Sequence, residues 1–244
     1  MGKQWKKDSK AEMASKRGAI FTKFVKEIQV AAKLGGIDPN TNIRLRLAVD
    51  IAKAASCPKD TIEKAIKRGA GLLDDGKEIE NLTYEGYGPH QVGVMVECQT
   101  DNRARTASEM RLMFNKSGGQ MGESGAVGWM FDRIGLIEAE KKGAFDLDEE
   151  AIEAGANDVE LVETNEGTNI DSSIKLAAFF TVSDELGQVR DVLSQRGWNV
   201  KVAELSYKPK NLMDLSEVQK TEVYEFLNKL EDHGDSHRVY ATVG

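Results

Sequence analysis

The sequence predicts an α/β (α+β) protein with an N-terminal three-helix domain, a discontinuous α/β middle domain and an inserted ferredoxin-like βαββαβ domain. Three observations lead to this prediction. Apolar residues recur at helical spacing from residue 16 to residue 69, and the pattern becomes strand-like after residue 80. Residues 135–207 then follow the order strand, helix, strand, strand, helix, strand. We therefore expect domains at residues 1–76, at 77–133 together with 208–244, and at 134–207.

The first helix is predicted at residues 16–34, and Gly35 and Gly36 end it. Its apolar residues gather on one face: Ile20, Phe21, Phe24, Val25, Ile28, Ala31 and Ala32. Four lysines fall within about a hundred degrees on the opposite face: Lys16, Lys23, Lys26 and Lys33. The sequence thus predicts an amphipathic helix with a lysine stripe, preceded at residues 1–15 by a basic arm or short helix.

Two further helices complete the N-terminal domain. Residues 38–42 supply N-cap chemistry for a helix in which Ile43, Leu47 and Ile51 recur at helical spacing, with Arg46 and Lys53 on its outer face. The third helix is predicted from Pro58 to Gly69, since proline is tolerated at a helix start. Its exposed cations are Lys59, Lys64, Lys67 and Arg68.

The pattern beyond the glycine-rich segment 69–76 predicts a turn at 84–89, a strand at 92–98, a helix at 103–116 and a strand at 127–131. The inserted domain is predicted to contain strands at 135–139, 159–162, 174–182 and 200–207, with helices at 148–154 and 184–196. Ser216 can cap a helix that runs to residue 230, and residues 239–243 form a last strand. That strand needs a sheet to join, which predicts a discontinuous middle domain.

Charge is distributed very unevenly along the chain, whose net charge is −7 at pH 7. Residues 1–70 hold 16 Lys and Arg against 7 Asp and Glu, a net charge of +9, whereas the remaining residues hold 17 basic against 33 acidic residues, a net charge of −16. A cationic end on an anionic body is expected where only one part of a protein meets a polyanion. Charge runs are commonly just solvated helix faces, but here the sign changes at a predicted domain boundary.

Cysteine usage and hydropathy bound the class of protein. Cys57 and Cys98 lie far apart, which predicts neither a disulfide framework nor a cysteine zinc site. No run of about 18 apolar residues occurs, and the basic start lacks the apolar core of a secretory signal. We therefore expect a cytoplasmic protein without a membrane partner.

No residue pattern indicates catalysis, a cofactor or a metal site. The segment 71–78 has the glycine and lysine spacing of a phosphate-binding loop, but Glu78 replaces the hydroxyl residue that would hold magnesium. His233 and His237 are close in sequence, yet Gly234 is expected to break the helix between them, which favours a polar turn. No nucleophile with a supporting base is recognisable, so the chain is predicted not to be an enzyme and to take no small-molecule substrate.

The glycine-rich loop at residues 118–128 is the most unusual segment of the chain. It leads from a helix into a strand, which is the reverse of a dinucleotide-binding turn. So many glycines around Met121 carry an entropic cost, which favours a contact role over an ordinary mobile connection. The candidate residues of this functional loop are Gly118, Gly119, Met121, Gly122 and Gly125.

The N-terminal domain is the candidate nucleic-acid-binding region. Lysines that neutralise phosphates release condensed counterions, which gives affinity without reading the base sequence. Few side chains suit base edges, and Trp5 is the main candidate for stacking, so recognition of shape or backbone is expected. The candidate contact residues are Lys3, Trp5, Lys6, Lys7, Lys10, Lys16, Arg17, Lys23, Lys26, Lys33, Arg44, Arg46, Lys53, Lys59, Lys64, Lys67 and Arg68.

Segments along the whole chain resemble the YebC/PmpR family. They read KRGAIFTK at 16–23, AAKLGG at 31–36, PKDTIEKAI at 58–66, YEGYGP at 84–89 and TDNRART at 100–106, and they continue through the loop and strand at 118–131. The resemblance implies a three-domain α/β protein with a helical first domain and an inserted ferredoxin-like third. One departure concerns the start, where Gly2-Lys3-Gln4-Trp5 replaces the usual Gly-His-Ser-Lys-Trp and lacks its histidine.

The resemblance implies two alternative functions, both without catalysis. Members of the family are described as DNA-binding transcriptional regulators, and also as ribosome-associated factors that help translation of difficult stretches such as consecutive prolines. The family includes a mitochondrial translational activator of cytochrome oxidase. The second description would place the loop at residues 118–128 near transfer-RNA ends. The expected partner is therefore DNA, or ribosomal and transfer RNA, bound by a monomer or weak dimer.

Overall fold

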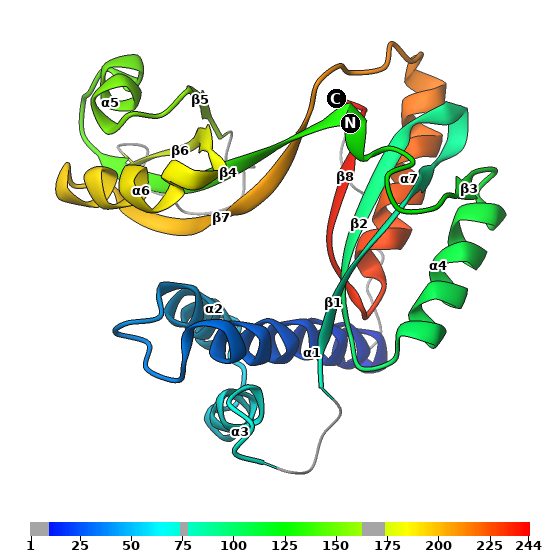
Figure 1. The fold of residues 1–244 in the computed structure, drawn as a ribbon, viewed down its shortest axis with the longest axis horizontal. Coiled ribbons are helices and arrows are strands. Elements are labelled where there is room, and N and C mark those ends of the chain that lie inside the picture. The colour runs from blue at the N-terminus through cyan, green and yellow to red at the C-terminus, as the bar shows by residue number, and fades with distance from the viewer. Residues whose placement is uncertain (1–9, 74–77, 163–173) are drawn as a thin grey trace. The chain divides into compact units, whose positions relative to one another are not determined.

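The computed structural model describes residues 10–73, 78–162 and 174–244, without the side chains of residues 10–17 and 19. Within these residues the chain forms seven α-helices and two four-stranded antiparallel sheets, which confirms the α/β fold class (Figure 1). It divides into two compact units, Met1–Trp129 with Asn211–Gly244, and Met130–Lys210. The predicted division into three domains stays a prediction, and its boundary at residue 76 lies outside the described residues.

Three helices form the first part of the larger unit: α1 (Lys10–Gly35), α2 (Ile43–Ala54) and α3 (Lys59–Gly69). α1 begins at Lys10 rather than at the predicted residue 16. The three helices share a core of fully buried side chains that includes Ile28, Leu45 and Ala65. Burying an Ile or Leu side chain contributes about 2 kcal/mol, so this core can hold the helices together.

The turn between α1 and α2 is built around the buried side chain of Asn42. Its Oδ1 accepts a hydrogen bond from the Leu45 amide at 3.0 Å, which caps α2. Its Nδ2 donates to the carbonyls of Ala31 and Gly36, both at 2.8 Å. A Cβ atom at Gly35 would lie 2.6 Å from this side chain, so the close approach of Asn42 requires glycine there. The predicted N-cap chemistry is thus confirmed.

The first sheet has the strand order β3-β1-β2-β8, and each neighbouring pair is antiparallel. Its strands are β1 (Glu80–Tyr87), β2 (Gly93–Thr100), β3 (Gln120–Met121) and β8 (Ser236–Ala241). The helices α4 (Arg103–Lys116) and α7 (Glu217–Asp232) pack on one face, where the Phe114 and Phe226 rings meet edge to face with centroids 5.1 Å apart (Figure 1). The last predicted strand therefore corresponds to β8, which joins this first sheet by pairing with β2.

Two predicted elements of this region are wrong. The predicted turn at 84–89 is mostly β1, and the chain turns only at the short 3-10 helix η1 (Pro89–Gln91). The prediction took Gly86 for a turn residue, but it lies within β1. Glycine is required there because β3 passes so close that a Cβ atom would lie 2.5 Å from the Gln120 carbonyl oxygen. The predicted strand at 127–131 is a turn followed by the 3-10 helix η2 (Gly128–Met130).

The second unit has the order of a ferredoxin-like sheet. Its elements are β4 (Phe131–Lys142), α5 (Leu147–Ala154), β5 (Asp158–Leu161), β6 (Ile174–Val182), η3 (Ser183–Glu185), α6 (Leu186–Gln195) and β7 (Asn199–Pro209). The strands are ordered β5-β6-β4-β7, with antiparallel neighbours throughout, as the βαββαβ pattern predicts. The helices α5 and α6 contribute to one core with Ile137, Phe179 and Trp198.

A paired charge lies at the edge of this second core. The Glu150 carboxylate receives hydrogen bonds from Arg196 Nε at 3.1 Å, Lys141 Nζ at 2.9 Å and Trp198 Nε1 at 2.8 Å. Burial acts to raise the pKa of this carboxyl, but the three donors outweigh it and lower the pKa to about 2.

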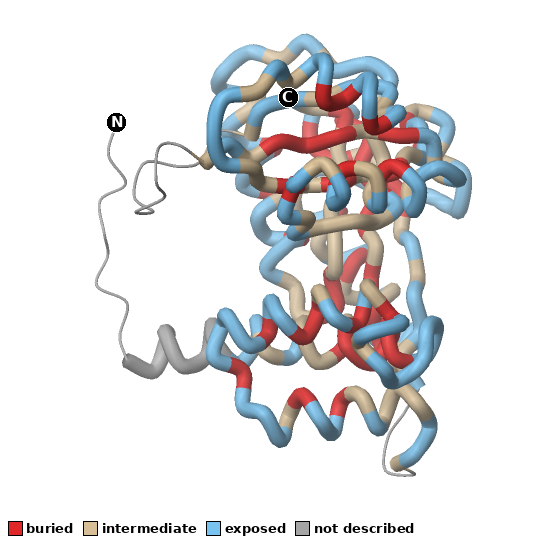
Figure 2. The backbone as a smooth tube through the Cα atoms, turned by 90° about the vertical axis from the view of Figure 1, so that its left-hand side faces the viewer, coloured by how far each residue is buried: buried red, intermediate tan, exposed pale blue. Residues whose placement is uncertain are grey.

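Elsewhere in the described chain, the buried residues lie mainly in strands and on the inner sides of helices, and the connecting segments are mostly exposed (Figure 2). None of the helices formed by described residues has the length and hydropathy to cross a membrane.

The buried carboxylate of Asp235 connects α1 to the first sheet. It pairs with Lys26 of α1 and accepts hydrogen bonds from Thr106 Oγ1 at 2.7 Å and Arg105 Nη2 at 2.8 Å. Lys26 also donates to the Gly234 carbonyl at 2.8 Å. Burial acts to raise the pKa of the Asp235 carboxyl, but its bonds with Lys26, Thr106 and Arg105 hold the pKa well below the usual range. α1 is therefore joined to α4 and to the start of β8.

A second connection runs through Glu27, the neighbour of Lys26. Its carboxylate accepts from Arg44 Nε at 2.7 Å and from Gln99 Nε2 at 2.7 Å, and lies 3.5 Å from Nε2 of His237 on β8. Burial, together with the charge of Arg238, lowers the pKa of the His237 imidazole to about 4. The ring is therefore neutral at neutral pH, even beside the Glu27 carboxylate.

The substitution Asp235→Asn is expected to lower the free energy of unfolding by about 3 kcal/mol, because it removes the charge opposite the buried Lys26. Urea unfolding at pH 7, followed by circular dichroism, measures the change. Asp232→Asn is the matched control, since Asp232 is an exposed carboxylate at the end of α7 and should contribute less than about 0.5 kcal/mol. Equal effects of the two substitutions would contradict the role given to Asp235.

The free energy of unfolding is also expected to decrease as the pH is lowered, because of His237. Because its pKa is about 4 in the folded protein and 6.5 ordinarily, the unfolded chain binds the proton more readily between these values. The stabilisation is fully present above pH 6.5 and is lost towards pH 4, by up to about 3 kcal/mol. Urea unfolding at both ends of this range should show a smaller loss for His237→Gln than for the unsubstituted protein. The same loss in both proteins would assign the pH dependence to other groups.

Candidate nucleic-acid interface

Three of the four lysines in the stripe predicted on α1 bind groups elsewhere in the same chain. Lys23 donates to the Glu231 carbonyl, Lys26 pairs with the buried Asp235, and Lys33 pairs with Glu78. Burial lowers the pKa of Lys23, against the opposing charges of neighbouring carboxylates. The helical period could not reveal this arrangement, because α1 packs against α2 and α3 on one side and against the end of the first sheet on another.

Apart from Lys33 near the end of α1, the exposed cations described in the helical part lie on α2 and α3. Arg46, Lys64 and Lys67 are exposed and form no ion pair with another described residue. Lys53 and Lys59 are exposed as well, each 3.7 Å from a carboxylate of its own helix. Such exposed pairs within a helix contribute only about 0.3–0.5 kcal/mol, so a phosphate can compete with them. These five side chains are the cations of α2 and α3 that the fold leaves open to a polyanion.

The other predicted contact residues are placed differently. Arg44 is bound through two nitrogens to Glu27, at 2.7 and 3.0 Å, and Arg68 is only partly exposed. Lys3, Trp5, Lys6 and Lys7 lie outside the described residues. Lys10, Lys16 and Arg17 belong to α1, but their side chains are likewise not described.

The predicted functional loop is an ordered structure rather than a loose connection. Gly118 and Gly125 adopt positive φ angles of 76° and 88°, which favour glycine. A Cβ atom at Gly119 would lie 2.3 Å from the Tyr87 carbonyl oxygen, so the loop passes directly against β1. Met121 is half-buried and packs against the core of the first unit.

The loop is organised by the buried carboxylate of Glu85 on β1. Its Oε1 accepts from the Gly125 amide at 2.8 Å, and its Oε2 accepts from the amides of Val127 at 2.9 Å and Gly128 at 2.8 Å. The Glu85 carbonyl accepts from the Gly122 amide at 2.8 Å. Backbone groups that would pair in the predicted strand at 127–131 are thus directed to one side chain instead.

Sequence reasoning missed two features near this loop. Trp129 follows it and is 64% exposed, with its indole N–H bonded to the Ala126 carbonyl at 3.1 Å. α4, which precedes it, carries four basic residues and only one acidic residue. The signal was present in the sequence of α4, but it was hidden by the acidic total beyond residue 70.

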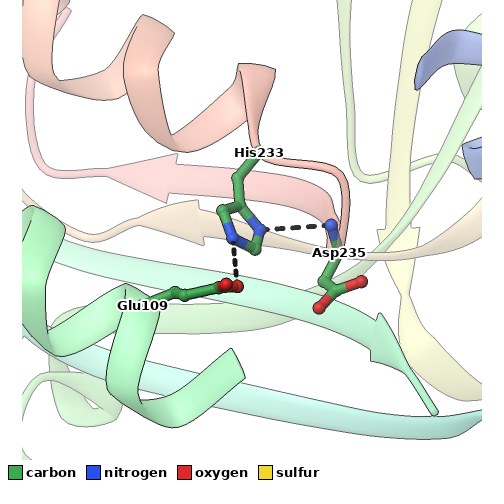
Figure 3. Close-up of side chains that lie close together, drawn as sticks. All are labelled: Glu109, His233 and Asp235. Carbon is green, nitrogen blue, oxygen red and sulfur yellow. Dashed lines mark hydrogen bonds and ion pairs between the residues drawn. The ribbon is translucent and has the colours of Figure 1, made fainter. Parts of the chain in front are cut away.

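One cluster has the residue types of a metal site. Glu109, His233 and Asp235 place ligand-type atoms within 4.8 Å of one another (Figure 3). His233 Nε2 lies 3.0 Å from Glu109, and His233 Nδ1 accepts from the Asp235 amide at 3.1 Å (Figure 3). Both ring nitrogens are therefore engaged, and a cation at Asp235 would have to displace Lys26 or Arg105. The cluster fits a structural role at the turn between α7 and β8.

Comparisons with known proteins decide the family. Residues 2–72 match the family model described as the TACO1/YebC protein N-terminal domain, and residues 79–243 match the TACO1/YebC second and third domain. The chain belongs to the TACO1/YebC family. The resemblance seen in the sequence motifs is thereby confirmed, and the TACO1/YebC models cover both units of the structure.

Relatives of this TACO1/YebC protein match it over nearly their whole length. A protein of Bdellovibrio bacteriovorus is 60% identical over 243 residues, with 100% of both chains covered, and one of Polaromonas sp. is 46% identical with 98% of both covered. Both are named probable transcriptional regulatory proteins. The crystal structure of a conserved hypothetical protein from Aquifex aeolicus has a TM-score of 0.79 at 40% identity, covering 98% of this chain and 94% of that chain.

The substitution Glu85→Gln is expected to loosen the loop of this TACO1/YebC protein, because an amide offers only one acceptor oxygen to the three backbone amides that Glu85 now binds. Leaving buried amides unpaired should cost about 1–3 kcal/mol and raise hydrogen exchange at Gly125, Val127 and Gly128. Hydrogen exchange measured by NMR tests this. Glu123→Gln, which alters an exposed carboxylate of the same loop, is the control. Unchanged protection in Glu85→Gln would remove Glu85 as the organiser of the loop.

Proposed function

We propose that this TACO1/YebC protein is a non-catalytic, nucleic-acid-binding regulator of gene expression, acting as a DNA-binding transcriptional regulator. The observation that carries the proposal is the set of exposed cations on α2 and α3, of which Arg46, Lys64 and Lys67 have no carboxylate partner among the described residues. The names of the relatives support regulation as the role of the family.

The chemistry of these side chains favours contact with phosphates over reading of bases. Lysine is a point charge on a flexible stem, so Lys64 and Lys67 suit backbone phosphates and not the fixed geometry of a base edge. Arg46 could reach a guanine, but one such residue gives little sequence discrimination. Binding is therefore expected to depend steeply on salt and weakly on base sequence.

The alternative is a ribosome-associated translation factor that binds ribosomal and transfer RNA and relieves stalling. The ordered glycine loop favours it. The loop lies beside Tyr87, at the end of β1, while α1 contacts Gln99 and Asp235 at the other end of the sheet. A molecule with contact elements at both ends can attach through its helices and present the loop elsewhere. The acidic remainder of the chain also suits a surface that faces solvent or basic proteins.

The triple substitution of Arg46, Lys64 and Lys67 by glutamine is expected to weaken nucleic-acid binding and to lower the slope of log K against log salt by about 2–3, because each lost phosphate contact removes nearly one unit. Fluorescence anisotropy with labelled duplexes at graded salt measures both quantities. Lys229→Gln, a substitution of an exposed lysine on α7, is the matched control. The proposed interface fails if the triple variant keeps the affinity and slope of the control.

A second measurement separates the two functions. Co-sedimentation with ribosomes at graded salt is compared with binding to specific and scrambled DNA duplexes. Tight binding to DNA duplexes without ribosome association would support the transcriptional regulator. Ribosome association that survives physiological salt, with only weak binding to either duplex, would support the translation factor instead.

A further inference from the structure

The helix α4 of the first unit carries cations that are not part of the proposed interface. α4 contains Arg103, Arg105, Arg111 and Lys116, with Glu109 as its one acidic residue. Arg105 is bound to Asp235 and Asp101, but Arg111 and Lys116 are exposed and form no ion pair with another described residue. Both lie in the second half of the helix, on either side of the face that carries the buried residues Met110 and Phe114. This half of α4 therefore offers two free cations to an anionic partner.

The end of α4 leads directly into the ordered glycine loop. The Gly119 amide donates to the Phe114 carbonyl at 3.0 Å, which holds the chain close to the helix after Lys116. Gly119 in turn lies against the Tyr87 carbonyl. The Tyr87 hydroxyl donates to the Ala126 carbonyl at 3.2 Å, the same oxygen that receives the Trp129 indole N–H. Tyr87 thus contacts both the exit of α4 and the residue that holds Trp129.

Trp129 is an unusual side chain to leave in water. It is 64% exposed, although burying a tryptophan would normally stabilise a fold. Its indole N–H is fixed by the Ala126 carbonyl, and the preceding amides of Val127 and Gly128 are fixed by Glu85. The ring is therefore held in place by the loop, and ordering it for a partner would cost little conformational entropy.

We propose that Arg111, Lys116 and Trp129 form a contact surface for single-stranded nucleic acid, in which an unpaired base stacks on Trp129 and the adjoining phosphates meet the two cations. The inference rests on the proposed function and adds a second contact surface to it. Charge decides the class of partner, since free cations and an exposed aromatic ring on one ordered segment of the chain suit a strand with negative phosphates and flat bases. Paired bases are already stacked within a duplex, so the surface selects single strands.

The probes are oligouridylate and oligothymidylate of about 12 nucleotides, with an RNA duplex of equal length for comparison. A Trp5→Phe background makes Trp129 the exposed reporter, because Trp198 is only 3% exposed. Stacking should quench its fluorescence. Trp129→Ala is expected to weaken single-strand binding about tenfold with an unchanged salt slope, and Trp129→Phe to restore part of the loss. The Arg111→Gln and Lys116→Gln pair should lower the slope by about 1.4.

Controls and outcomes separate this inference from the proposed function. Val218→Ala removes an exposed apolar side chain on α7, and Lys229→Gln an exposed lysine; neither should affect binding. Single-strand binding that is equal in Trp129→Ala and the control would overturn the inference, while the helical interface stands if its triple variant still loses duplex binding. Failure to bind any probe at low salt would overturn both. Quenching of Trp129 by the RNA duplex as strong as that by either single strand would overturn the selection of unpaired bases.

Discussion

The hydrogen-bonded ion pair of Asp235 is the interaction on which the larger unit depends. One buried carboxylate receives Lys26 from α1, Arg105 and Thr106 from α4, and belongs to the turn between α7 and β8. A carboxylate removed from water is stable only when such donors replace its hydration. The helical part is therefore joined to the sheet through a specific polar connection, reinforced by Glu27, and not through apolar packing alone.

A second buried carboxylate serves the other end of the same sheet. Glu85 binds the backbone amides of the glycine loop, as Asp235 binds the side chains around α1. Each carboxylate binds an element that packs at one end of the sheet. The consequence is a sheet with an ordered cationic helical part at one end and an ordered loop with an exposed tryptophan at the other. This arrangement is what makes two separate nucleic-acid contacts a coherent proposal.

The elements of the fold were largely predictable because most are marked by local chemistry. Asn42 and Ser216 begin helices at the positions expected from capping, and the helix at 103–116 is correct at both ends. These two errors occur where a residue's conformation is set by contact with a residue far along the chain. Gly86 looks like a turn residue but faces the backbone of β3, and Val127 looks like a strand residue but donates its amide to Glu85. Neither relation leaves a periodic pattern in the sequence.

The candidate site divides in the same way. The sequence by itself determined the fold class, the family, the cationic excess of the first 70 residues and the presence of an unusual glycine loop, because these follow from composition, period and motif. Only the tertiary structure decided which cations are available. Lys26 and Asp235 form a buried ion pair although 209 positions separate them along the chain. Charge on a helix face can be read from sequence, but whether that charge meets a carboxylate or water depends on contacts that only the folded chain creates.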